Sequence, residues 1–135
     1  MMSLNFKNLI VFGLISFAMS CQKKDNTPVD LSKVTVDFTS LTAGQLFHKG
    51  DIIPVNVNVS YDAEIVGIGV QIIDSTTDSL VYEDDQDTHT NNFPFQRSWV
   101  DTFSSDATLQ VKILVFVANN TTVPAIRSIY IKTAP

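Results

Sequence analysis

The sequence predicts an all-β domain built as a two-layer sandwich. From Val34 to the end of the chain, apolar and polar residues alternate with a period of two, and turn-forming residues separate the alternating runs. No window of about eleven residues after Cys21 has the apolar stripe of an amphipathic helix. Strict alternation is typical of strands with one face in a core and the other in water.

The alternating runs number about seven, which is the number expected of an immunoglobulin-like sandwich of antiparallel strands. Strands are expected at 34–38, 55–61, 65–73, 80–82, 93–100, 109–117 and 125–132.

Turn residues between the runs support this spacing. Residues 60–63 are expected to join the second and third strands, and residues 119–122 the last two. Pro94 cannot donate a hydrogen bond to a strand ladder, which favours an edge position for the fifth strand.

The first twenty residues have the pattern of a secretory signal peptide. Lys7 precedes an apolar run over residues 9–19, and a small residue, Ser20, closes the run. The run is too short to span a bilayer, which takes about 20 residues. The chain therefore divides into a signal peptide (1–20), a polar tether (21–32) and one domain (33–135).

Cys21 directly follows the signal and is the only cysteine in the chain, so it can form no internal disulfide. The sequence Ala18-Met19-Ser20-Cys21 resembles the end of a bacterial lipoprotein signal. That resemblance implies cleavage before Cys21 and three acyl chains on it, which would anchor the protein in a membrane. The alternative is an ordinary cleaved signal followed by a free thiol.

The charge of the mature chain argues against nucleic-acid binding. Eight of the nine Lys and Arg residues and all fourteen Asp and Glu residues follow residue 20, and 8 minus 14 gives a net charge of −6. Nucleic-acid binding depends on clustered basic residues. Lys23-Lys24-Asp25 resembles the sorting signals of Bacteroidota lipoproteins, which implies the outer membrane and leaves its periplasmic and cell-surface faces open.

Residues 83–92 form the densest polar stretch and are expected to be a long hairpin loop. Asp84, Asp85, Asp87 and His89 are its candidate ligands for a metal, and calcium is the candidate cofactor because it prefers six to eight oxygen ligands. The stretch does not fit the EF-hand pattern. The alternative is a solvated acidic loop without a ligand.

Few other residues are of the types that carry out catalysis, and we expect the protein not to be an enzyme. The chain has two histidines and, once Cys21 is acylated, no thiol, which leaves little material for a nucleophile and its base. Tyr82, Trp99 and Tyr130 could stack against sugar rings; alternatively, Trp99 belongs to the core.

Leu114 and Phe116 lie on the outward phase of a strand whose inward phase is already apolar. Two interpretations stay open. Either this strand is covered on both faces, or the two residues form an exposed patch for a protein partner.

Several motifs follow one another along the domain: Gly44 with Phe47, Gly50-Asp51-Ile52, Phe93-Pro94-Phe95 and Ser98-Trp99. Their order resembles immunoglobulin-like domains of uncharacterised Bacteroidota lipoproteins, which implies a fold and brings no catalytic residues.

Two further motifs, Asp74-Ser75-Thr76 and Asp78-Ser79-Leu80, resemble the sites at which Bacteroidota attach O-glycans to exported proteins. This second resemblance implies O-glycosylation at Ser75 and Ser79.

These observations together predict a lipid-anchored module of the cell envelope that acts by binding or structural association. Its expected partners are the membrane, through acylated Cys21, and envelope proteins or glycans. The alternative function is that of a carbohydrate-binding accessory lipoprotein in a glycan-uptake system.

Overall fold

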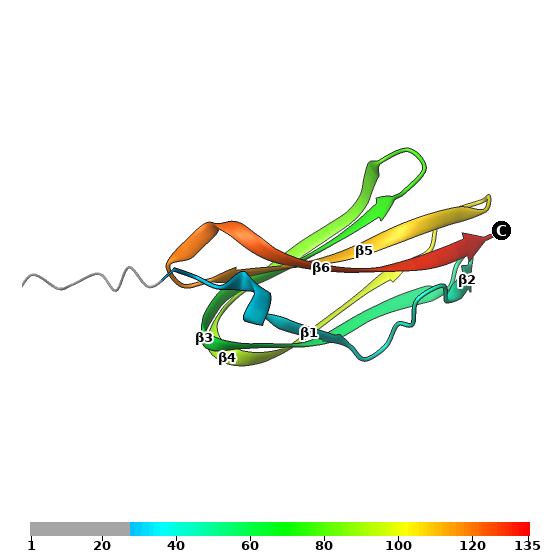
Figure 1. The fold of residues 1–135 in the computed structure, drawn as a ribbon. Helices are drawn as coiled ribbons and strands as arrows, with labels where there is room; N and C mark the ends of the chain where they lie inside the picture. Colours follow the sequence, from blue (N-terminus) through cyan, green and yellow to red (C-terminus); the bar gives the residue numbers. More distant parts are fainter. Residues whose placement is uncertain (1–27) are drawn as a thin grey trace, which may run out of the picture.

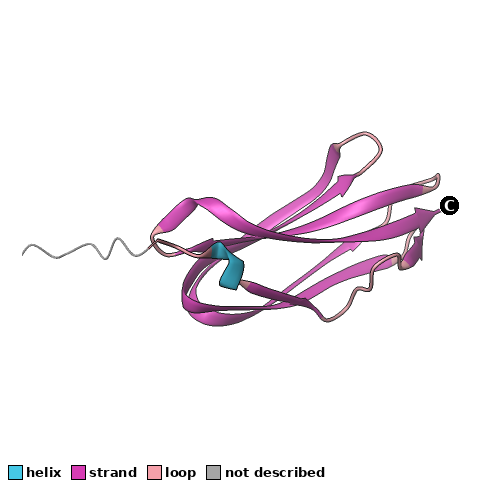
Figure 2. Ribbon diagram, viewed as in Figure 1, coloured by secondary structure: helices cyan, strands magenta, loops and turns pink. Residues whose placement is uncertain are grey.

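The computed structural model describes residues 28–135, and they form an all-β, sandwich-like fold (Figures 1 and 2). The predicted all-β class is confirmed. The residues expected to form a signal peptide, and Cys21, lie outside the described residues. The elements in chain order are a short 3-10 helix η1 (Leu31–Lys33) and the strands β1 (Thr35–Phe38), β2 (Leu46–His48), β3 (Ile52–Asp74), β4 (Ser79–Val100), β5 (Ala107–Val117) and β6 (Asn120–Ala134).

Two long strands, β3 and β4, run through both layers of the fold. Residues 52–60 of β3 pair with β1 and with residues 92–100 of β4, and these segments make the first layer. Residues 65–74 of β3 pair with residues 79–90 of β4 and with β5, which pairs with β6; these make the second layer. Figure 1 shows the β3–β4 hairpin curling from one layer to the other.

The predicted turn at residues 60–63 is wrong, because β3 is continuous there. The pairing register with β4 shifts between Ser60 and Ile65 and again between Ile65 and Gly67. Such irregularities bend a strand sharply without ending it. The second and third predicted strands are therefore the two halves of one strand, which changes layers at this bend.

The predicted loop at residues 83–92 is also wrong, because this stretch lies inside β4. Its residues pair with β3, for example Asp85 with Gly69 and Thr90 with Ile65. Since β4 pairs with β3 alone, it is an edge strand, where polar side chains meet solvent at little cost. The edge position expected from Pro94 is confirmed.

Two smaller differences concern the ends of the domain. Strand β6 begins at Asn120, so most of the predicted loop at 119–122 belongs to a strand. The sequence also gave no indication of β2, whose three residues are too few to show a period and which pairs with β6 in parallel. The sheet is therefore mixed rather than wholly antiparallel.

The core lies between the two layers and is supplied by the inward phase of each strand. In β5 the predicted alternation is confirmed, because Leu109, Val111, Ile113, Val115 and Val117 are all fully buried. Phe95 of β4 is fully buried and belongs to the part of the core that the first layer supplies. Burying one such side chain contributes about 1.5–3 kcal/mol to stability.

The described part of the predicted tether packs against β6. The Arg127 guanidinium donates to the carbonyl oxygens of Leu31 at 3.3 Å and Val34 at 3.0 Å, and the Val34 side chain is buried. In Figure 1 this segment lies at the end of the molecule opposite the C-terminus. Within residues 28–135, no helix is long and apolar enough to cross a membrane.

Candidate functional site

The most distinctive surface is the outer face of the second layer, on the side away from the core. Across it run three lanes of side chains. The lane on β4 is acidic, and the middle lane on β3 includes two glycines. The lane on β5 and β6 is apolar around Leu114 and polar around Lys112, which pairs with Gln71 and Ser128. The lanes include Glu83, Asp85 and Asp87 on β4; Gly67, Gly69 and Gln71 on β3; and Lys112, Leu114, Phe116 and Ile126 on β5 and β6.

The middle lane has a hollow that we call the glycine trough, with Gly69 on its floor. Gly67 lies beside it, next to the Phe116 ring. A cavity of about 260 Å³ opens over Gly69, between Asp85 and Leu114. Neither glycine has a positive φ, and a Cβ added at either would find its nearest atoms at ordinary van der Waals distances of 3.7–3.9 Å. Neither backbone conformation nor packing therefore requires glycine here.

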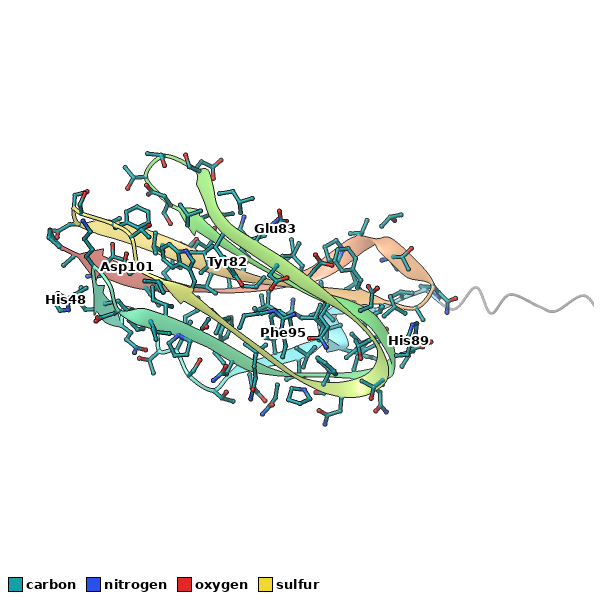
Figure 3. The ribbon with its side chains drawn as sticks, turned by 180° about the vertical axis from the view of Figure 1, so that it is seen from behind. His48, Tyr82, Glu83, His89, Phe95 and Asp101 are labelled. Atoms are coloured by element: carbon teal, nitrogen blue, oxygen red, sulfur yellow. The ribbon has the colours of Figure 1, made fainter. Side chains whose placement is uncertain are left out.

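The acidic lane consists of exposed carboxylates that form no ion pair within residues 28–135. Asp85 pairs in register with Gly69, and Asp87 with Gly67. None of the ion pairs within residues 28–135 includes Glu83, Asp85 or Asp87. The Gln71 amide donates to the Glu83 carboxylate at 2.8 Å and thereby orients it beside the trough. Glu83 is seen on the outer side of β4 in Figure 3.

The apolar lane decides between the two interpretations of Leu114 and Phe116. Strand β5 is central in its layer, yet only its inner face is covered, and both side chains are half-buried on the outer face. Leu114 pairs across the strands with Ile126, whose side chain is 49% exposed. The three residues form a continuous apolar surface along one side of the trough.

On the inner face, Asp84 and Arg97 join the two layers at the open edge formed by β4. The Arg97 Nε donates to Asp84 Oδ2 at 2.7 Å, and the guanidinium lies 4.7 Å from the centre of the Phe95 ring. The Arg97 hydrogen bond, together with the Asp85 backbone N–H, holds the pKa of Asp84 below its ordinary value. Burial, followed by the charge of Asp84, raises the pKa of the neighbouring Tyr82. This cluster ties the two halves of β4 together.

The four candidate metal ligands do not converge. Asp84 faces inward and is bound to Arg97, whereas Asp85 and Asp87 face outward. His89 lies near the bend of the hairpin, where its Nδ1 is 2.8 Å from Glu64 Oε1 (Figure 3). In the part of the chain that the structure describes, no group of three or more His, Cys, Asp or Glu side chains is arranged to hold a metal ion.

The three aromatic residues considered as a sugar platform are also separated. Trp99 packs against the core and meets Phe103 edge-on, with 6.2 Å between the ring centroids. Tyr82 likewise packs against the core, on the inner side of β4 (Figure 3). Tyr130 is on the outer face of the second layer and is 49% exposed. These residues offer no common stacking surface.

Both O-glycosylation candidates lie on the tip of the β3–β4 hairpin. Ser75 and Ser79 are exposed at the two sides of this turn. The Asp74 carboxylate accepts a hydrogen bond from the Thr76 backbone N–H at 2.9 Å, which fixes the turn. The two hydroxyls are therefore accessible at the same projecting end of the molecule.

Sequence reasoning missed Asp101, a buried carboxylate with an exposed fraction of 1%. Its Oδ1 accepts from the Phe103 N–H at 2.9 Å, and its backbone bonds to Gly50 and Asp51 in the turn before β3. It joins two loops at the C-terminal end of the molecule, near His48 (Figure 3). No sequence signal distinguishes it, because the contacts are between distant segments.

Comparisons with known proteins add no assignment to this geometry. The chain matches no protein-family model and no curated protein.

Proposed function

We propose that this protein is a non-catalytic binding module of a bacterial cell envelope, with an immunoglobulin-like sandwich held at the outer membrane by acyl chains on Cys21. One observation carries the binding role: the glycine trough with its acidic and apolar sides. An open hollow with an apolar wall and a few polar groups is the usual form of a binding site.

The anchor and the described domain are compatible in geometry. Residue 28 lies at the end of the molecule opposite the C-terminus, close to Asn119 in the β5–β6 turn. The seven residue-to-residue steps from Cys21 to Pro28 reach at most about 25 Å when extended. The β5–β6 turn therefore faces the membrane, and the hairpin tip with Ser75 and Ser79 points away from it, where O-glycans would be accommodated.

Glycan binding is the second candidate, and the outer face of the first layer favours it. Asn56, Gln96 and Ser98 surround a shallow hollow of about 410 Å³ together with Pro54. Amide and hydroxyl groups of this kind hydrogen-bond to sugar hydroxyls. This face would serve the carbohydrate-binding accessory role expected from the sequence.

The anchor is tested by expressing the chain in a bacterial host beside Cys21→Ser. We expect the wild-type protein to lose its signal, gain acyl mass and partition into the membrane fraction, and Cys21→Ser to do none of these. Intact mass and fractionation measure the outcome. An unmodified Cys21 in a protein that stays in the aqueous fraction would overturn the anchor and leave the binding role to be judged on the trough alone.

A further inference from the structure

We infer that the glycine trough binds a partner protein segment in which a lysine or arginine side chain lies beside apolar residues. This inference rests on the proposed binding role and adds the chemistry of the partner. Three features of the outer face carry it: a glycine, Gly69, on the floor of the hollow, carboxylates that form no ion pair within residues 28–135, and an apolar wall that is only half-covered.

The glycines indicate close approach of another chain. Glycine weakens the interior of a strand, and it often marks a place where a ligand or a second backbone approaches. Gly67 lies at a register shift of β3, and glycine in a strand often marks such a bulge. Gly69 is away from the shift and has ordinary room for a Cβ and an ordinary backbone conformation, so the fold gains nothing from the missing side chain there. What Gly69 provides is the floor of the hollow between the acidic and apolar lanes.

The acidic lane specifies the charge of the occupant. Glu83, Asp85 and Asp87 recur at every second residue of β4, so like charges lie about 7 Å apart along one face. Charge on an edge strand also prevents unwanted pairing, which accounts for carboxylates on β4. It does not account for glycines in the central strand β3. A cationic partner would relieve the repulsion, whereas an anionic lipid surface would be repelled.

The apolar lane specifies the rest of the occupant. Leu114 and Phe116 line the hollow directly. Ile126 pairs with Leu114 on the next strand and extends the apolar surface. Neighbouring strands lie about 4.8 Å apart, so a segment running along β3 has carboxylates on one side and apolar side chains on the other. A peptide with basic and apolar side chains matches both sides. A neutral glycan would leave the carboxylates without a counter-charge.

The test selects ligands for the purified full-length protein from a displayed library of random peptides. We expect the selected peptides to combine Lys or Arg with apolar residues and to bind more weakly as salt is raised. Gly69→Val, which fills the trough, should weaken their binding by roughly tenfold or more, and Asp85→Asn should weaken it as well. Thr35→Val and Asp37→Asn, two exposed positions on β1, are the matched controls and should leave the affinity unchanged.

The outcomes separate the inference from the proposed function. Neutral or acidic peptides whose binding is lost in Gly69→Val would overturn the cationic partner and keep the binding module. Peptides that bind Gly69→Val as tightly as the wild type would overturn the trough as the binding site and this inference with it, and the proposed binding role would then rest on the first-layer hollow alone. Gly69→Ala, the smaller change, is measured in parallel, with thermal unfolding of each variant, so that lost binding is distinguished from lost folding.

Discussion

Adjacent acidic residues in β4 differ in role because alternate side chains of a strand face opposite sides. Asp84 faces inward, where it binds Arg97 and joins the two layers. Asp85 faces outward beside Gly69, where no ion pair within residues 28–135 reaches it. From the sequence, both residues were expected to lie in one loop. Because they are neighbours in a strand instead, one carboxylate is structural and the other is a candidate for binding.

Replacing the trough glycines should stabilise the protein. In a strand, glycine is less favourable than alanine by about 0.5–1 kcal/mol, so Gly69→Ala should raise the free energy of unfolding by that amount. Gly44→Ala is the matched comparison. Gly44 has a φ of +75°, and alanine there should lower the free energy of unfolding by about 1–2 kcal/mol. Urea unfolding measures both, and a loss of stability in Gly69→Ala would show that the fold needs that glycine.

Asp84 should make stability depend on pH in the acid range. Because the folded state lowers its pKa, its contribution is complete above the ordinary pKa of an aspartate and is lost as the pH falls through the lowered value. The difference in unfolding midpoint between wild type and Asp84→Asn should be largest at neutral pH and shrink in acid. Asp37→Asn controls for the loss of one exposed carboxylate. A difference of equal size at both ends of the range would contradict this account.

At the scale of elements, the β3–β4 hairpin determines how the sheet is divided into layers. Each strand runs through both layers, and the register shifts near Ser60 and Ile65 allow the bend. The strand phases predicted from the sequence were right on both sides of the bend, since Val57 and Val70 are both buried as expected. The expected loop at 83–92 was wrong, because polar residues of an edge strand look like a loop in sequence. The expected turn at 60–63 was wrong because the chain bends there without leaving β3.

The β5–β6 turn depends on one residue in the left-handed region. Asn119 has a φ of +67°, which asparagine and glycine tolerate and β-branched residues do not. Asn119→Val should therefore lower the free energy of unfolding by about 1–2 kcal/mol, and Asn119→Gly should leave it equal or slightly higher. Thermal or urea unfolding would measure this pair. Equal stability of the two variants would show that the turn rearranges.

Across the whole molecule, the free energy of local unfolding should increase with the number of strands that a strand pairs with. Residues 65–74 of β3 are paired on both sides, with β4 and β5, and include the fully buried Val70 and Ile72. Strand β2 has three residues and one neighbour. Hydrogen exchange should be slowest at the amides of Val70 and Ile72 and much faster at Phe47. Faster exchange in the centre of β3 than in β2 would contradict the observed topology.

The sequence by itself determined the all-β class and the inward phase of the strands, because a period of two is a local property of neighbouring residues. It also marked Leu114 and Phe116 as outward-facing. Only the tertiary structure showed that 83–92 is a strand that brings Asp85 beside Gly69 and opposite Leu114. That arrangement depends on the register between segments far apart in the chain, which is set by the packing of the whole core and not by any one stretch.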